Sequence, residues 1–154
     1  MYRLRYPDTK KDPERRWALP ERVFFACGAC HILAFAFLET YPASDFTPMW
    51  IRPTGGLPGN HIVVVRDGWA FDYHGYSEWH HLLSHFEKKA RRAWPTWDAH
   101  LIELPQDVLI SEAKSRTYDG LWLRGPKQFL YDALPRAHNY LHRFASPGEV
   151  LQRA

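Results

Sequence analysis

The segment 61–73 restricts the possible folds of this chain more than any other. Residues 61–66 are mostly β-branched, which is typical of a strand, and residues 69–73 are expected to form a second strand. Between them stands Asp67-Gly68, a dipeptide that favours a two-residue hairpin turn. The sequence therefore predicts an antiparallel β-hairpin that ends at Gly75.

A second strong signal is a run of seven consecutive apolar residues, Ile32–Leu38. Periodicity alone does not separate a buried helix from a buried strand in such a run. The length of the segment 29–40, its alanines and leucines, and the stop at Pro42 favour a helix. Because this helix is apolar on all sides, it is expected to be central, with Cys30 in its first turn.

The rest of the chain predicts a loop, a strand and flanking helices. Residues 41–60 are rich in proline and glycine and are expected to form a loop, with Phe46 and Trp50 as one wall of a cleft. Ser77 is expected to cap a helix that Pro95 ends. One stripe of that helix is expected to be buried: Trp79, Leu82, Leu83, Phe86, Ala90 and Ala93. A strand is expected at 99–104 and helices at 107–116 and 126–144, the last kinked or split by Pro135.

Together these elements predict an α+β fold, in which the central buried helix with Cys30 packs on an antiparallel hairpin or sheet with flanking helices. A chain of 154 residues suffices for one domain. Residues 1–20 are polar and basic, with three prolines, and are expected to form an arm. That leaves 21–154 as a single domain.

Composition narrows the class of protein. No stretch is long enough to span a bilayer, and the first residues lack the apolar core of a signal peptide. A cytoplasmic location is therefore expected, or export by a specialised secretion system. The net charge of +3 is ordinary solubility charge. The densest basic run, 88–92, ends a predicted helix, where cations favour the helix dipole, so nucleic-acid binding is not expected.

The two cysteines, Cys27 and Cys30, are too few for a secreted disulfide scaffold and indicate a thiol site or half of a metal site. A cysteine nucleophile reacts as the thiolate, which the unpaired N–H groups at a helix start favour. Cys30 occupies such a position, and we expect it to be the nucleophile. A histidine is then needed as base, together with a third group that holds its tautomer.

The hairpin supplies both partners. With a turn at residues 67–68, the register pairs Val63 with Asp72 and His61 with His74. His61 and Asp72 then lie diagonally on one face, roughly 7–8 Å apart at the backbone, a gap that an imidazole and a carboxylate can bridge. We therefore expect a triad of Cys30, His61 and Asp72, with His74 as the alternative histidine.

Two local patterns resemble known thiol enzymes. Cys27-Gly28-Ala29-Cys30-His31 resembles the papain-type pattern Cys-Gly-Ser/Ala-Cys-Trp, whose second cysteine is the nucleophile. The order Cys30, His61, Asp72 is similar to that of transglutaminase-like enzymes and of papain-fold deamidase domains in bacterial toxins. The resemblance covers roughly residues 22–76. It implies a cysteine-dependent acyl-transfer enzyme, with a thioester on Cys30 and no cofactor or metal.

Acyl transfer also requires donors that stabilise an oxyanion. The backbone N–H of Cys30 is the expected first donor. Asn60, Trp69 or a loop N–H is a candidate for the second, and Trp50 is a candidate substrate contact. Little chain precedes the hairpin to build a two-lobed cleft, so we expect a side-chain amide of a protein, or a small amide or acyl donor, with a peptidase as the alternative.

Two further alternatives use the cysteine pair differently. Cys27-x-x-Cys30 ahead of a helix is also typical of a thioredoxin-like oxidoreductase, which would require Cys27 for exchange. The same pair is half of a zinc site, which His81 and His85, one helical turn apart, would complete.

Overall fold

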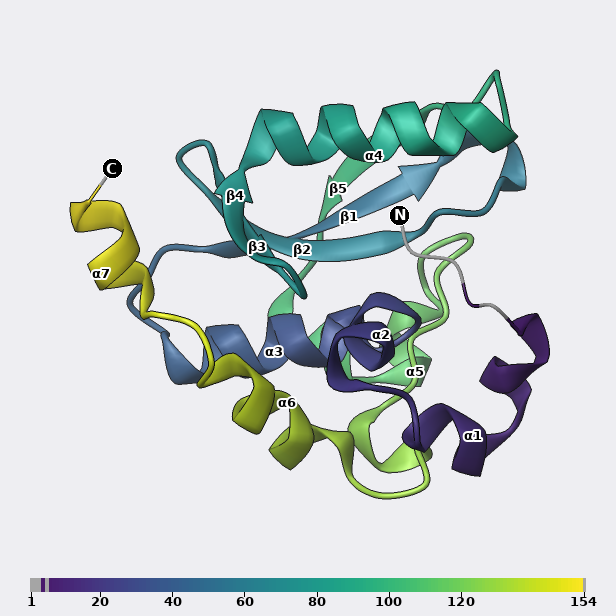
Figure 1. The fold of residues 1–154 in the computed structure, drawn as a ribbon, viewed down its shortest axis with the longest axis horizontal. Coiled ribbons are helices and arrows are strands. Elements are labelled where there is room, and N and C mark those ends of the chain that lie inside the picture. The colour runs from purple at the N-terminus through teal and green to yellow at the C-terminus, as the bar shows by residue number, and fades with distance from the viewer. Residues whose placement is uncertain (1–3, 5, 154) are drawn as a thin grey trace.

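The computed structural model describes Leu4 and residues 6–153 and has the α+β fold predicted from the sequence (Figure 1). One antiparallel sheet has the strand order β4-β3-β2-β1-β5. The strands are β1 (Thr47–Pro53), β2 (His61–Arg66), β3 (Trp69–Asp72), β4 (Gly75–Glu78) and β5 (Ala99–Glu103). The α-helices of the described residues are α1 (Pro13–Trp17), α2 (Glu21–Ala26), α3 (Cys30–Thr40), α4 (Trp79–Ala93), α5 (Glu112–Ser115), α6 (Ala133–Leu141) and α7 (Pro147–Gln152).

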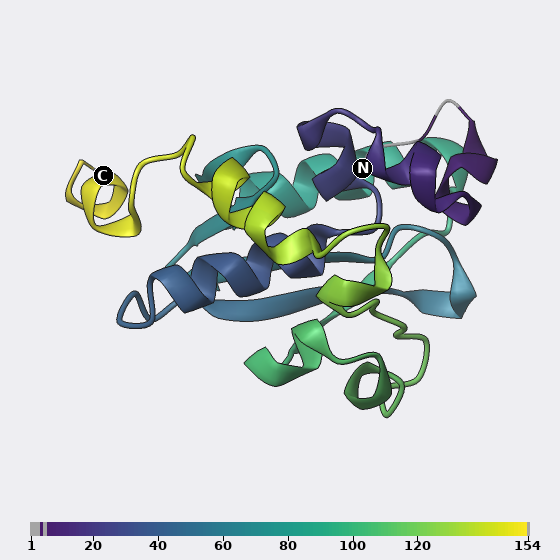
Figure 2. The same cartoon turned by 90° about the horizontal axis from the view of Figure 1, so that it is seen from below.

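The sheet separates two apolar layers. Helix α4 covers one face, whereas α3 lies on the other face with α6 beyond it (Figure 1, Figure 2). On the α4 side, Ile51 of β1 packs with Phe86 and Ala90. The larger core lies on the α3 side, where Val64 and Phe71 of the sheet meet the helix. Strand β2 therefore has buried residues on both faces, which explains its unbroken apolar run.

Helix α3 begins at Cys30, close to the predicted start at residue 29. It buries residues on every side, from Ile32 through Leu38 with only Phe35 partly exposed. The ring of Phe37 contacts Phe46 and Phe71 at centroid separations of 5.0 and 4.8 Å. This packing anchors the helix against the sheet and fixes where its first residue lies.

The hairpin forms with the predicted register: Arg66 pairs with Trp69 and Val64 with Phe71. Asp67 and Gly68 have φ values of 47° and 81°, as a turn with two left-handed residues requires. The β2–β3 ladder ends at the Val64–Phe71 pair. Beyond it the ends of the two strands are not paired with each other.

The prediction of a loop throughout 41–60 is wrong, because β1 runs from Thr47 to Pro53 between β2 and β5. Pro48 is tolerated there because its N and its carbonyl both point toward β5, where the ladder has not yet begun. The carbonyl accepts a bond of 3.1 Å from the N–H of Leu104, just past the end of β5. The N–H that proline lacks thus falls at the end of a ladder. The residues that follow β1 form a short 3-10 helix, η2 (Thr54–Gly56).

The expected cap at Ser77 is also wrong, because the chain first adds the edge strand β4 and starts α4 at Trp79. Tyr76 favours the strand conformation of this segment, because its ring packs against that of Phe71 on β3, with the ring centroids 5.0 Å apart. The predicted stripe of α4 packs on the sheet as far as Ala90, but Ala93 is exposed.

The C-terminal helices are shorter than predicted. Residues 107–116 divide at Ser111 into the 3-10 helix η3 (Gln106–Ile110) and α5, because the Ser111 hydroxyl caps α5 by accepting from the N–H of Lys114. Residues 126–144 divide into the 3-10 helix η4 (Pro126–Gln128) and α6, which Asp132 caps. The predicted kink or split at Pro135 is wrong, because Pro135 lies in the first turn of α6, where its missing N–H is tolerated, and the helix continues through it.

The segment predicted to be an N-terminal arm contains a 3-10 helix, η1 (Pro7–Lys11), and α1. Asp12 caps α1 by accepting from the N–H groups of Glu14 and Arg15. None of the described helices has the length and apolar character needed to cross a bilayer.

Candidate active site

His61 and Asp72 form a buried pair where β2 begins and β3 ends. The Nε2 atom of His61 lies 2.9 Å from Oδ2 of Asp72, and each side chain is 4% exposed. The sequence predicted this contact from the hairpin register. Because Nε2 is engaged by the carboxylate, Nδ1 is the ring nitrogen left to face another group.

His74 does not pair with His61, so that part of the predicted register is wrong. Strand β3 ends at Asp72 and the chain reverses through Tyr73 and His74 into β4. The backbone N–H of His74 donates to Oδ1 of Asp72 at 2.9 Å, while its half-exposed ring stays 3.7 Å from that oxygen. One carboxylate oxygen therefore holds the turn and the other holds His61.

Two aromatic rings pack against the imidazole of His61. The ring of Phe86, from α4, stacks on it at a centroid distance of 5.6 Å and an angle of 9°. Tyr73 meets it edge-on at 5.7 Å. Phe86 belongs to α4, whereas Cys30 begins α3 on the other face of the sheet. The site therefore lies at the end of β2, where the layer of α3 and the layer of α4 meet.

Cys30 is the first residue of α3, and its side chain is partly exposed. Burial opposes ionisation of this thiol, but hydrogen bonding and positive charge from His31 and His61 outweigh it and lower its pKa to about 5. As the first residue of the helix, Cys30 also has a backbone N–H without an intrahelical acceptor. It thus has the two properties expected of a nucleophile, a stabilised thiolate and an adjacent oxyanion donor.

His61 shows the complementary shift. Burial disfavours the imidazolium, but hydrogen bonds to Asp72 and Cys30 overcome that and raise the pKa of His61 to about 9. Burial opposes the charged form of Asp72 too, yet the bonds from His61 and His74 hold the pKa of the carboxyl well below its ordinary value. The two shifts are complementary: the pKa of the thiol is lowered and that of the imidazole is raised, so both favour a thiolate beside an imidazolium.

His31 is a site residue that the sequence reasoning did not assign. It is 2% exposed, and its Nε2 lies 2.7 Å from the carbonyl oxygen of Arg124. Since a carbonyl only accepts, Nε2 of His31 carries the hydrogen. The sequence signal was its place directly after Cys30, but its partner lies 93 residues away.

The structure places only one of the candidate oxyanion and substrate residues, Asn60, at the site with an exposed side chain. The indole N–H of Trp50 donates to Oδ1 of Asn60 at 2.9 Å, and Trp50 is 1% exposed, so it cannot be a substrate contact. Phe46 is likewise buried in the core, and the expected aromatic wall of the cleft is absent. Asn60 is exposed beside His61 and keeps its NH2 group as a possible donor. Trp69 lies at the turn end of β3, paired with Arg66, away from the site.

The second cysteine differs from Cys30. Cys27 follows α2, is 4% exposed, and has a pKa that burial raises. Both cysteines are free thiols. The described residues ahead of Cys27 form helices only, without the strand that a thioredoxin-like unit places before its cysteine motif.

The four residues of the zinc alternative do not come together. Among the described residues, the one group of three possible metal ligands within 4.8 Å of one another is Glu78, His80 and His81. All three are exposed, and Glu78 forms ion pairs with both histidines at 3.5 and 3.1 Å. This group contains neither cysteine and lies outside the site.

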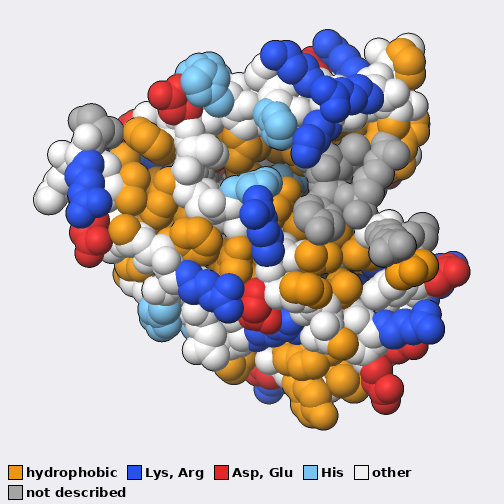
Figure 3. Space-filling model, in the orientation of Figure 1, with side chains coloured by type: hydrophobic (Ala, Val, Ile, Leu, Met, Phe, Trp, Pro, Cys, Tyr) orange, Lys and Arg blue, Asp and Glu red, His pale blue; other side chains and the backbone are white. Residues whose placement is uncertain are grey.

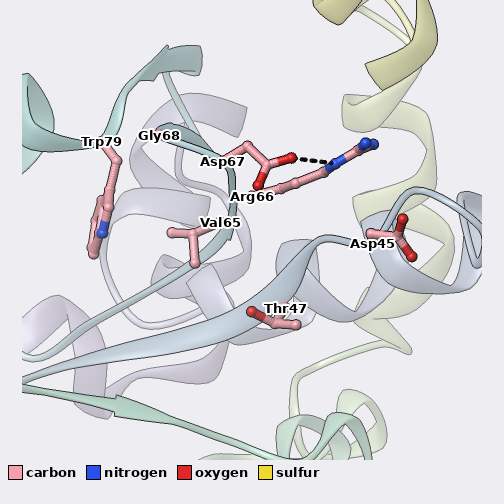
Figure 4. Close-up of a pocket in the computed structure, with 7 residues that line it drawn as sticks. All are labelled: Asp45, Thr47, Val65, Arg66, Asp67, Gly68 and Trp79. Atoms are coloured by element: carbon pink, nitrogen blue, oxygen red, sulfur yellow. Dashed lines mark hydrogen bonds and ion pairs between the residues drawn. The ribbon is translucent and has the colours of Figure 1, made fainter.

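The molecular surface is hollowed below α4, and histidine and apolar side chains are visible in the hollow (Figure 3). A separate pocket lies at the other end of the hairpin, around the turn (Figure 4). Its lining consists of Asp45, Thr47, Val65, Arg66, Asp67, Gly68 and Trp79. It shares no residue with the pair of His61 and Asp72, and its lining contains neither cysteine nor histidine.

Comparison of the chain with protein-family models, curated proteins and solved structures finds no match.

Proposed function

We propose that this protein is a cysteine-dependent acyl-transfer enzyme, with Cys30 as nucleophile, His61 as general base and acid, and Asp72 as the group that orients His61. One observation carries the proposal: the buried imidazole of His61 is bonded to the buried carboxylate of Asp72 through Nε2, which leaves Nδ1 for a second partner. Interaction with this imidazole also lowers the pKa of the Cys30 thiol, as a nucleophile requires. The resemblance to papain-like and transglutaminase-like enzymes supports the same roles.

In the first step, the Cys30 thiolate attacks the carbonyl carbon of an amide, forming a C–S bond while the carbonyl π electrons move to oxygen. The backbone N–H of Cys30 donates to that oxyanion, and the NH2 group of Asn60 is the candidate second donor. When the tetrahedral intermediate collapses, the C–N bond breaks. The amine leaves with the proton from His61, and a thioester remains on Cys30.

In the second step, water or an amine attacks the thioester carbonyl and gives a proton to His61. The C–S bond breaks, the acyl group leaves as an acid or a new amide, and the thiolate–imidazolium pair is restored. Throughout, Asp72 keeps its charge and stabilises the imidazolium.

We favour a side-chain amide or a small acyl donor as the substrate. The site lies at the end of one sheet, between the first turn of α3 and the start of β2, rather than between two lobes that could hold several residues of an extended chain. The resemblance to toxin deamidase domains supports the same preference.

Mass spectrometry of a glutamine-containing protein incubated with the enzyme tests this function. Deamidation adds about one mass unit, and transfer to a supplied amine adds the mass of that amine. Cys30→Ala should abolish either change, and Cys27→Ser should retain it. Backbone cleavage without either modification would make the protein a peptidase, and equal activity of Cys30→Ala would refute the assignment of the nucleophile.

A further inference from the structure

A buried arginine lies next to the cysteine motif without a carboxylate partner. Arg16, from α1, is 7% exposed. Its Nη2 atom donates to the carbonyl oxygen of Gly28 at 2.8 Å, and its guanidinium lies 4.8 Å above the ring of Phe129. Its buried Nε has no hydrogen-bond partner among the residues that the structure describes.

Arg136 shows how this fold otherwise accommodates a partly buried guanidinium. Its Nε donates to Glu21 at 2.7 Å, and its two terminal nitrogens donate to the carbonyl oxygens of Trp17 and Leu19. A buried cation without such a carboxylate carries a large desolvation cost. Arg16 has no ion pair with a carboxylate within the described chain, so its charge requires another explanation.

The position of Arg16 depends on the glycine of the motif. Gly28 has a φ of 105°, which favours glycine, and a Cβ atom at this residue would collide with Nη2 of Arg16. Cys27 precedes Gly28, and Cys30 follows two residues later. The guanidinium is therefore bonded to the peptide segment that leads into the first turn of α3.

The charge of Arg16 persists near both thiols. Burial and the neighbouring Arg124 lower its pKa to about 10, while Cys30 and Cys27 act in the opposite direction. Arg16 is thus protonated at neutral pH. Of the two thiols, burial raises the pKa of Cys27 whereas the histidines lower that of Cys30, so a negative charge in the motif falls on Cys30.

We propose that Arg16 is a positioning residue for Cys30: its buried guanidinium fixes the Gly28 carbonyl, and with it the entry into α3, and its charge stabilises the Cys30 thiolate. The inference rests on the proposed function insofar as Cys30 is the nucleophile. It adds a residue that belongs neither to the triad nor to the oxyanion donors.

The test measures the rate of Cys30 alkylation by iodoacetamide as a function of pH, in a Cys27→Ser background so that one thiol reacts. The rate follows the thiolate fraction, so the curve's midpoint reports the thiol pKa without a known substrate. The variants are Arg16→Met, which keeps the aliphatic stem, and Arg16→Lys, which keeps the charge. Arg15→Met is the matched control, because Arg15 lies on the same helix but is exposed and pairs with Asp12.

With Arg16 intact, the midpoint is expected near pH 5. Arg16→Met should raise it by a few tenths of a pH unit, less than the loss of either histidine would, because His31 and His61 contribute most to lowering the thiol pKa. Arg16→Lys should keep the midpoint but lower the plateau rate about threefold or more, because an ammonium lacks the planar fork that holds Gly28. Arg15→Met should change neither quantity.

Three results would overturn the inference. An unchanged midpoint in folded Arg16→Met would exclude the counter-ion role. If Arg16→Met does not fold, as circular dichroism would show, an Arg16→Lys curve identical to that of the parent in midpoint and plateau would exclude the positioning role. If the midpoint of the parent lies near the ordinary thiol value, Cys30 is not a stabilised thiolate, and the proposed function itself fails. This result is distinguishable from a failure of the Arg16 inference alone, in which the parent midpoint stays low.

Discussion

Asp72→Asn is the most informative substitution at the site, because the carboxylate has two hydrogen-bond duties. Oδ1 accepts from the backbone N–H of His74, and Oδ2 accepts from Nε2 of His61. An asparagine has one oxygen for these two donors. The backbone N–H of His74 is fixed by the turn, so the oxygen should remain there and the NH2 group should face His61.

That exchange has a definite consequence for His61. An NH2 group can only donate, so Nε2 of His61 must accept and its hydrogen moves to Nδ1. With Nδ1 protonated, a neutral His61 can no longer take a proton from the thiol of Cys30. The substitution thus enforces the wrong tautomer while preserving the size of the side chain and the turn.

The magnitude follows from the imidazolium. A pKa raised from 6.5 to about 9 corresponds to about 3 kcal/mol in favour of the protonated ring, shared between Asp72 and Cys30. Losing even half of this free energy, about 1.5 kcal/mol, should lower the ion-pair population about tenfold. The tautomer change adds to this, so we expect turnover to fall by about 100- to 10,000-fold, in the range known for such substitutions in triads.

Two assays measure this effect. The alkylation curve of Cys30 should shift to higher pH, and the single-turnover rate of thioester formation should fall, while the circular-dichroism spectrum at 25 °C should remain that of the folded parent. His74→Ala is the control, because it removes a ring but leaves the backbone N–H. If Asp72→Asn reacts like the parent at neutral pH, or if His74→Ala is the more damaging change, Asp72 does not act through His61.

Three other outcomes are expected. The pH profile of kcat/KM should be bell-shaped, rising through about pH 5 as the Cys30 thiolate forms and falling through about pH 9 as His61 loses its proton; a profile that keeps rising above pH 9 would contradict the ion pair. Limited iodoacetamide at pH 6, followed by peptide mapping, should label Cys30 before Cys27, and the reverse order would overturn the choice of nucleophile. Phe37→Ala should cost about 3–5 kcal/mol and lower Tm by roughly 10 °C, because Phe37 is fully buried among aromatic rings; a shift of only 1–2 °C would show that the core beneath α3 collapses into the gap.

The parts of the fold that were predictable depend on local signals. The Asp67-Gly68 turn fixes its own conformation and the strand pairing next to it, so the contact between His61 and Asp72 followed from the sequence. The apolar run after Cys30 likewise sufficed to predict a central helix. In both cases the information lies within a few residues of the structure that it determines.

The features that the sequence did not predict depend on contacts between residues far apart in the chain. The segment of β1 contains Pro48 and Pro53 and becomes a strand only because β2 and β5 pair with it on either side. His31 acquires its role from a carbonyl 93 residues away, and Arg16 from a glycine 12 residues ahead, within a segment of ordinary polar character. No periodicity or turn signal carries such information.

The two-residue turn at Asp67-Gly68 determines whether Asp72 meets His61 at the opposite end of the hairpin. Side chains alternate between the faces of a strand, so an extra residue at the turn that is taken up into the ladder would shift β3 by one position against β2 and carry Asp72 to the other face. His61 would then lose its carboxylate although no residue of the site had changed. Tolerance of this chain to insertions should therefore be lowest at an exposed turn, where surface loops usually accept them most readily.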